Sequence, residues 1–238
     1  MKVLVLGHKG MLGHMVVKYL RDQNINVITT DIRWPESPFK LGMRLDYVIN
    51  CIGAIPQRTN KFDINYYLPI WLDLNAPCKV IHPGTDCEMD SDDYGISKRI
   101  SADYINSPIS SQTKILKTSI IGPELNSTSS LLEWFLSQEG EVQGYSKAIW
   151  NGNTTLEWAK QCLNLMNSWE SYKTETIIQS SKSISKFGLL TLIKQIFNKT
   201  NVTIIPKPLG TNKTLKGTLH TKGINQQLKE LKEYYYKK

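Results

Sequence analysis

The chain has 238 residues, 40% of them hydrophobic, which is enough to bury the core of one large domain or of a domain with a smaller lobe. The net charge of +8 comes from basic residues spread along the chain, and no helix-turn-helix, zinc or RNA-recognition signature accompanies them, so we expect no nucleic-acid partner. The four cysteines form no CxxC pair, and no stretch approaches the roughly 18 apolar residues of a membrane span, so we expect a soluble, cytoplasmic protein without a disulfide framework or a metal site.

Three glycines at three-residue spacing follow the first apolar run. Residues 2–6 are typical of a strand, Gly7, Gly10 and Gly13 of a tight turn, and 14–21 of an amphipathic helix. Such a turn leaves backbone N–H groups at the positive end of a helix dipole, where a pyrophosphate can bind. Glycines also serve ordinary turns, but the strand before them and the helix after them favour a dinucleotide site.

A second predicted strand, residues 25–30, ends at Asp31. An acid 24 residues after Gly7 can accept hydrogen bonds from the adenosine ribose hydroxyls. Asp31 repels a 2′-phosphate and favours NADH, whereas Arg33 and Lys9 partly neutralise such a phosphate. The cofactor prediction is therefore NADPH or NADH.

Strands and helices continue to alternate through the first half of the chain. The strand at 46–54 ends in small residues, Cys51, Ile52 and Gly53, where a cofactor can approach the backbone. We expect Pro69 to kink or delay the helix that contains it. The alternation predicts an α/β fold with a Rossmann-like, doubly wound parallel sheet. The remaining predicted elements are helices at 39–45, 63–75 and 92–106 and strands at 79–82 and 114–121.

The second half of the chain is predicted as a smaller α/β lobe for the substrate. No repeat or low-complexity linker separates it, so we expect a dinucleotide domain at 1–122 and a substrate lobe at 123–238, from which one strand can return to the main sheet. Its predicted elements are helices at 130–137, 156–169, 186–197 and 223–236 and strands at 176–179 and 202–205.

Tyr94 and Lys98 stand four residues apart on the predicted helix at 92–106. This spacing puts both side chains on one helix face, where the ammonium could favour the phenolate and bring the pKa of the phenol into the range of general acid–base catalysis. Such pairs also occur by chance on surface helices. Thr85, shortly after the strand at 79–82, could polarise a substrate carbonyl that takes hydride from a nicotinamide.

Several segments in the same order resemble the dTDP-4-dehydrorhamnose reductase family of extended short-chain dehydrogenases/reductases, over essentially the whole chain. They are the three glycines, Val48–Gly53, Thr85-Asp-Cys87, Tyr94-Gly-Ile-Ser-Lys98, Thr118–Glu124 and Trp150-Asn-Gly-Asn-Thr-Thr155. The resemblance implies an NAD(P)H-dependent reductase of a nucleotide-linked 4-keto-6-deoxy sugar. Its partner is then the nucleotide-sugar substrate, and a homodimer is allowed.

The resemblance also implies the site residues. The catalytic set is Thr85, Tyr94 and Lys98, with Thr85 also touching the substrate, and Lys98 holds the nicotinamide ribose. In the second half, Lys213 matches a basic position near the sugar nucleotide, while Trp150 either stacks on base or sugar or belongs to the core. The residues expected around the cofactor are Gly7, Lys9, Gly10, Met11, Leu12, Gly13, Asp31, Arg33, Cys51, Ile52, Gly53, Asn65, Tyr94 and Lys98.

The sequence departs from this family between Thr85 and Tyr94, which are only nine residues apart where the family has a longer loop. Gly84 also replaces the usual serine, and the connection from Asp31 to Asp46 is short. Two alternatives to the reductase therefore stay open. One is a regulatory subunit that keeps the cofactor fold, and the other is an epimerase or dehydratase that oxidises and re-reduces its substrate.

Overall fold

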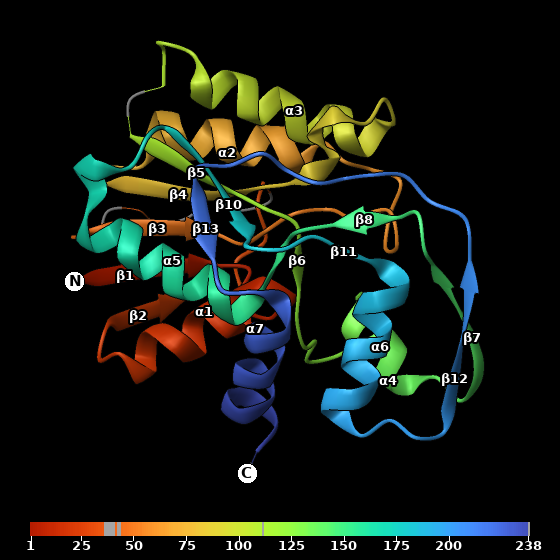
Figure 1. The fold of residues 1–238 in the computed structure, drawn as a ribbon. Helices are drawn as coiled ribbons and strands as arrows, with labels where there is room; N and C mark the ends of the chain where they lie inside the picture. The colour runs from red at the N-terminus through yellow and green to blue at the C-terminus, as the bar shows by residue number, and fades with distance from the viewer. Residues whose placement is uncertain (36–40, 42–43, 111, 238) are drawn as a thin grey trace. The chain divides into compact units, whose positions relative to one another are not determined.

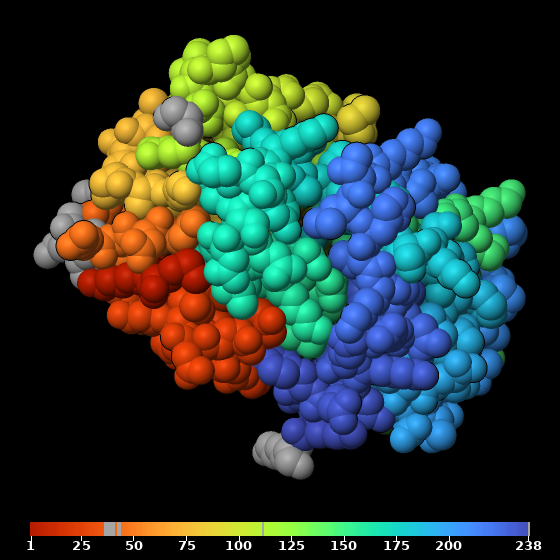
Figure 2. Space-filling view, turned by 60° about the vertical axis from the view of Figure 1, so that its left-hand side comes forward, coloured from red at the N-terminus to blue at the C-terminus, as the bar shows by residue number. Residues whose placement is uncertain are grey.

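A computed structural model describes residues 1–35, 41, 44–110 and 112–237 (Figure 1). The chain forms two compact units, Met1–Lys117 with Ala159–Thr176 and Thr118–Trp158 with Ile177–Lys238. The Ala159–Thr176 segment, teal in Figure 2, lies against the rest of the first unit, and Tyr47 donates a hydrogen bond to the carbonyl of Met166 within it at 2.8 Å. The predicted boundary at residue 122 assigns this segment to the second half instead.

A seven-stranded sheet has the order β13-β10-β5-β4-β3-β1-β2. The ladders of β1 with β2 and β3, of β4 with β3 and β5, and of β10 with β13 are all parallel, which confirms the predicted Rossmann-like α/β fold class. Because the chain runs to opposite sides of β1, to β2 and then to β3, the carboxyl ends of β1 and β3 form the switch point where such sheets bind ligands. The strands are β1 Lys2–Leu6, β2 Asn26–Thr29, β3 Tyr47–Asn50, β4 Lys79–Gly84, β5 Thr113–Lys117, β10 Glu175–Ser180 and β13 Leu219–Thr221.

The helices of the first unit begin within one residue of their predicted starts, except α1 (Met11–Asp22), which begins three residues before the predicted stretch at 14–21. Asp92 caps α3, because its Oδ1 accepts a hydrogen bond from Gly95 N at 2.7 Å. Helix α2 runs unbroken from Ile64 to Asn75 with Pro69 inside it, so the delay predicted at this proline is not observed. Residues 36–40 and 42–43 of the predicted helix at 39–45 lie outside the described residues. These helices are α1 Met11–Asp22, α2 Ile64–Asn75, α3 Asp93–Asn106 and, shared between the two units, α5 Thr155–Asn167.

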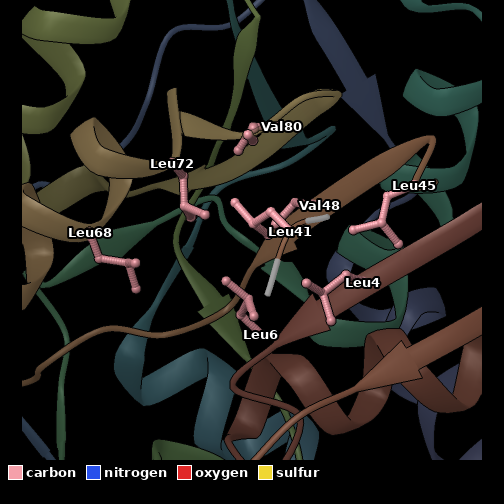
Figure 3. Close-up of a cluster of buried hydrophobic side chains, with 9 residues drawn as sticks. Leu4, Leu6, Leu41, Leu45, Val48, Leu68, Leu72 and Val80 are labelled. Carbon is pink, nitrogen blue, oxygen red and sulfur yellow. The ribbon is translucent and has the colours of Figure 1, made fainter. Parts of the chain in front are cut away.

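One buried apolar cluster fixes α2 over the sheet (Figure 3). Its side chains come from β1, β3, β4 and α2 and from residues that precede β3 or follow α2. The strands contribute continuous apolar runs, as expected for parallel strands covered on both faces. Packing of this cluster sets the position of the first turn of α2, which carries Asn65. The members are Leu4, Leu6, Leu41, Leu45, Val48, Leu68, Leu72, Ala76 and Val80.

The predicted strand at 114–121 is two strands, because the chain leaves the large sheet at Thr118. The Thr118 hydroxyl accepts a hydrogen bond from Asn153 Nδ2 at 2.9 Å, and β6 (Ile120–Ile121) then pairs with β9 (Asn153–Thr154). Thr118 and Asn153 both belong to the second unit. A polar side-chain contact over 35 residues of sequence thus ends a strand that looks continuous in its apolar pattern.

The second unit contains the predicted helices and several strands that were not predicted. Ser185 caps α6 as predicted, because its hydroxyl accepts a hydrogen bond from Gly188 N at 3.1 Å. In the segment predicted as a helix at 223–236, the α-helix ends at Leu231, and a π-helical turn, Lys232–Tyr236, follows it. No helix in the described ranges is long and apolar enough to cross a membrane. The further elements are α4 Leu131–Ser137, α6 Lys186–Phe197, α7 Ile224–Leu231, β7 Gly140–Tyr145, β8 Ile149–Trp150, β11 Ile184–Ser185 and β12 Val202–Lys207.

Gly13 gives a direct test of the turn between β1 and α1. A Cβ at Gly13 would lie 2.2 Å from the carbonyl oxygen of Gly7, so Gly13→Ala should lower the free energy of unfolding by about 1–3 kcal/mol. Gly10→Ala is the matched control, because its Cβ would meet the same oxygen at 3.3 Å, and it should cost less than about 1 kcal/mol. Urea unfolding measures both, and equal losses would contradict this close approach.

His82 on β4 is neutral in the folded chain. Asn50 Oδ1 accepts a hydrogen bond from Ile52 N at 3.0 Å, so the atom 3.2 Å from His82 Nδ1 is the amide nitrogen, which can only donate. His82 Nδ1 is therefore unprotonated. Burial lowers the pKa of His82 well below 6.5, and the charge of Lys98 lowers this pKa further.

Unfolding should therefore become easier in acid. Below pH 6.5 the unfolded chain protonates His82 while the folded chain does not, so stability present above this pH is lost as the pH falls, by up to about 1.4 kcal/mol per unit. His82→Gln should lose less stability than wild type between pH 7.5 and pH 5.5 in urea unfolding. The exposed His220 supplies the control variant His220→Gln. An unchanged pH dependence in His82→Gln would refute a neutral His82.

Candidate active site

The turn after β1 leaves room for an anion. Gly7 has φ +74°, and a Cβ there would lie 2.8 Å from the carbonyl carbon of Cys51 and 2.9 Å from the nitrogen of Ile52, so the ends of β1 and β3 meet backbone to backbone. Gly7 O accepts a hydrogen bond from Gly10 N at 2.9 Å, which closes the turn.

Helix α1 begins in this turn with its positive end uncovered by side chains. Its N-cap is Gly10, which has no side chain to bond the N–H groups of the first turn, and that turn carries no acidic residue. The first-turn N–H groups of Met11, Leu12 and Gly13 thus suit an anion such as a pyrophosphate. All these residues were predicted as cofactor contacts.

Asp31, at the end of β2, forms an ion pair with Lys9 of the glycine turn. Asp31 Oδ1 lies 2.6 Å from Lys9 Nζ and 3.6 Å from His8 Nε2, and the hydrogen bond from Lys9 lowers the pKa of Asp31. Both partners are largely exposed, and an exposed ion pair contributes little to stability. A ligand can therefore separate Asp31 from Lys9. Arg33 is also exposed.

Asn65, at the start of α2, uses both ends of its amide within the protein. Oδ1 accepts a hydrogen bond from Ala54 N at 2.8 Å, and Nδ2 donates to Ala54 O at 3.0 Å and to Ser97 Oγ at 3.1 Å. Its side chain is 1% exposed. Asn65 thus ties the segment after β3 to α3, beside the predicted cofactor contact Gly53.

Thr85 follows β4 and is the N-cap of a 3₁₀ helix, η1, Asp86–Met89. Its hydroxyl accepts a hydrogen bond from Cys87 N at 3.3 Å and donates to Asp86 Oδ1 at 3.1 Å. The Thr85 side chain lies close enough to the phenol of Tyr94, on the first turn of α3, to influence the pKa of that phenol. The structure therefore brings the two predicted catalytic hydroxyls together in spite of the short connection.

The phenol of Tyr94 is neutral. Burial raises the pKa of Tyr94 far above its ordinary value, the charges of Cys87 and Asp86 raise it further, and the nearby Thr85 side chain acts against this shift. The predicted lowering of this pKa by Lys98 is wrong for this structure, because burial dominates. Phe62 covers the phenol edge-on, with ring centroids 5.7 Å apart.

Lys98 lies one helical turn after Tyr94 and is 8% exposed. Burial lowers the pKa of Lys98, while Glu88 and Cys87 raise it. A Cβ built on Gly53 would lie 3.8 Å from Lys98 Nζ, so the ammonium reaches the segment after β3. Within the first unit, Lys98 thus stands between Tyr94 and the predicted cofactor contacts.

Four residues around the site were not predicted: Phe62, Glu88, Ser97 and Lys117. Glu88 carried a signal in the sequence, because Thr85-x-x-Glu88 is a capping-box pattern. A capping box is recognised in a sequence by the apolar helix that follows it, and no such helix follows Glu88, so the pattern did not identify this residue. For Lys117 no local pattern exists, since its contacts come from distant segments.

In the second unit, the segments of Trp150 and Lys213 lie side by side. Lys213 N donates a hydrogen bond to Ile149 O at 2.9 Å, and Asn151 bonds both N and O of Leu215. Trp150 is 7% exposed, so its indole is a core group in this structure and not an open stacking surface. In the described part of the chain, no group of three or more His, Cys, Asp or Glu side chains could hold a metal ion.

No protein-family model and no curated protein sequence matches the chain significantly. Solved structures do. A dTDP-4-dehydrorhamnose reductase of Clostridium acetobutylicum superposes with a TM-score of 0.77 at 17% identity, covering 100% of both chains. The enzyme of the same name from Bacillus anthracis, in complex with NADP, gives 0.76 at 14% identity, covering 98% of this chain and 100% of that one.

A UDP-N-acetylglucosamine 4-epimerase of Bacillus cereus follows at a TM-score of 0.71 and 14% identity, covering 99% of this chain and 96% of the epimerase. Identities this low show a shared fold and leave function to the site itself. The chain therefore has the fold of these sugar-nucleotide reductases and of this epimerase over its whole length.

Proposed function

We propose that this protein is an NAD(P)H-dependent reductase of a nucleotide-linked 4-keto-6-deoxy sugar. The observation that carries the proposal is the meeting of Thr85, Tyr94 and Lys98 in the unit that also holds the anion cradle of Gly7–Gly13. An acid, a hydroxyl and a buried ammonium beside a dinucleotide cradle fit carbonyl reduction. The shared fold with two dTDP-4-dehydrorhamnose reductases supports this substrate class.

The residues of the glycine turn fit a dinucleotide. Position 7 carries no side chain, since a Cβ there would clash with Cys51, and the first turn of α1 has no acidic residue that would repel a pyrophosphate. The first turn of α1 would hold the pyrophosphate, Asp31 the adenosine ribose and Lys98 the nicotinamide ribose. When bound, NAD(P)H supplies the hydride that reduces the carbonyl carbon.

The protein then acts on the carbonyl oxygen. Thr85 turns its hydroxyl hydrogen from Asp86 Oδ1 to this oxygen and orients it by a hydrogen bond, and Tyr94 transfers its phenolic proton to it, so that the ketone becomes an alcohol. The high pKa of Tyr94 keeps this proton on the phenol until the oxygen becomes basic. Solvent then returns the proton to the phenolate that remains.

Two alternatives make different predictions. The fold shared with a 4-epimerase supports a chain that oxidises and re-reduces its substrate, with no net consumption of reduced cofactor. A regulatory subunit would bind the cofactor without turnover. The proximity of Thr85 and Tyr94 favours a catalytic protein, because the short connection still brings the two groups together.

Tyr94→Phe tests the proton donor. It should lower kcat at least about 100-fold on nucleotide-linked 4-keto-6-deoxy sugars, because the general acid is lost, and leave the Kd of NADPH within about threefold. The loss of NADPH absorbance measures turnover, and fluorescence titration measures binding. Tyr67→Phe, at an exposed tyrosine of α2, is the control. Wild type that binds NADPH and reduces none of these sugars, or a mutant that keeps its rate, would contradict the proposal.

The ion pair of Lys9 and Asp31 should set the cofactor preference. Asp31→Ala removes a charge that repels a 2′-phosphate and releases Lys9, so the ratio of kcat/KM for NADPH over NADH should rise on the order of fivefold to tenfold. Lys9→Ala should lower this ratio. Asp22→Ala breaks another exposed ion pair, Lys18 with Asp22, and should leave the ratio unchanged. A ratio that stays constant in both test variants would show that the ion pair of Lys9 and Asp31 plays no part in cofactor recognition.

A further inference from the structure

The short connection between Thr85 and Tyr94 is held by a buried carboxylate that points back at Thr85. Glu88 Oε1 accepts a hydrogen bond from Thr85 N at 2.8 Å, and Glu88 is 3% exposed. Together with the Thr85 hydroxyl, this bond makes a capping box around η1. The carboxylate thus fixes the backbone of the residue whose hydroxyl faces Tyr94.

The second oxygen of Glu88 has a partner of its own. Glu88 Oε2 lies 2.5 Å from Lys117 Nζ at the end of β5, and the same ammonium lies 3.4 Å from Glu175 Oε2. The side chains of Glu88 and Lys117 are 4% and 13% exposed, and a buried carboxylate keeps its charge only beside such a cation. Lys117 therefore orients the carboxylate so that the other oxygen faces Thr85.

The same pair explains why a glycine precedes Thr85. A Cβ at Gly84 would lie 2.9 Å from Lys117 Cβ and 3.0 Å from Glu88 Oε1. The carboxylate and the stem of the lysine thus fill the space that a side chain at position 84 would need. Gly84, Glu88 and the short connection are parts of one arrangement.

The rest of η1 is fixed to the helix that carries Tyr94. Arg99 Nη1, on α3, donates hydrogen bonds to Glu88 O at 3.1 Å and to Asp90 O at 3.5 Å. A Cβ at Gly95 would lie 2.5 Å from Cys87 O, so α3 and η1 meet without a side chain between them. The Thr85 backbone and Tyr94 consequently belong to one rigid piece.

We infer that Glu88 is a positioning residue for the reaction: its carboxylate, oriented by Lys117, holds Thr85 so that the hydroxyl stands beside the phenol of Tyr94. The inference rests on the proposed reductase function for its consequence in turnover. The hydrogen bond from Thr85 N to Glu88 can be tested without turnover.

Two double variants isolate this hydrogen bond. Glu88→Gln with Lys117→Met keeps an oxygen for Thr85 N, and Glu88→Leu with Lys117→Met removes it. Both lack the ammonium of Lys117, so Glu175 loses the same partner in each and the two variants differ only at residue 88. Urea unfolding checks that both are folded. NMR on protein labelled with ¹⁵N-threonine follows exchange of the Thr85 amide. It should stay protected in wild type and in the Gln variant and exchange rapidly in the Leu variant.

The consequence for turnover is measured with the same pair. The Leu variant should lose about 10-fold to 100-fold in kcat relative to the Gln variant, with the Kd of NADPH unchanged, because a misplaced group costs rate rather than cofactor binding. In a Thr85→Val background this difference should vanish, since Glu88 acts through Thr85.

Protection of the Thr85 amide in the Leu variant would overturn the inference, as would a loss of rate that persists in the Thr85→Val background. If wild type reduces no nucleotide-linked keto sugar, the proposed function falls, and amide exchange alone decides whether Glu88 holds Thr85.

Discussion

Close backbone approach at the carboxyl ends of the strands is the constraint on which the first unit depends. Gly7 meets the backbone of Cys51, and Gly84 meets Lys117 and Glu88, at distances that leave no space for a Cβ. Because no side chain separates them, β1, β3 and β4 end side by side, and α1 begins directly at the turn after β1. The groups that remain at this edge are N–H donors, hydroxyls and a buried ammonium, which are the groups that the proposed cofactor and carbonyl substrate require.

The short connection after β4 shows how a compact chain can keep such a site. A longer loop could hold Thr85 by packing of its own side chains, whereas here a 3₁₀ turn is stabilised by one capping box and one buried ion pair. Both are directional, and the ion pair is strong only because Glu88 and Lys117 are shielded from water. The connection therefore loses length without separating Thr85 from Tyr94.

Local signals made much of the fold predictable. Asp92 and Ser185 each cap the helix that follows them, and the apolar run before Gly7 is the first strand. Contacts distant in sequence were not predictable in this way: β7 is half polar and exists because it pairs with β12, and Lys117 meets Glu88 only after β4 and β5 align. The sequence suggested that Thr85, Tyr94 and Lys98 would lie near one another, but the burial that raises the pKa of Tyr94 could not be predicted from a four-residue spacing.

Transfer of deuterium tests the central claim, that this edge of the sheet reduces a sugar carbonyl, most directly. NADPH carrying deuterium at both hydrogen positions of nicotinamide C4 is incubated with a nucleotide-linked 4-keto-6-deoxy hexose, and the product is examined by mass spectrometry and NMR. A reductase places a single deuterium on C4 of the sugar for each NADPH oxidised. A chain that binds NADPH and leaves the sugar unlabelled, or that interconverts sugars without consuming NADPH, would contradict the account.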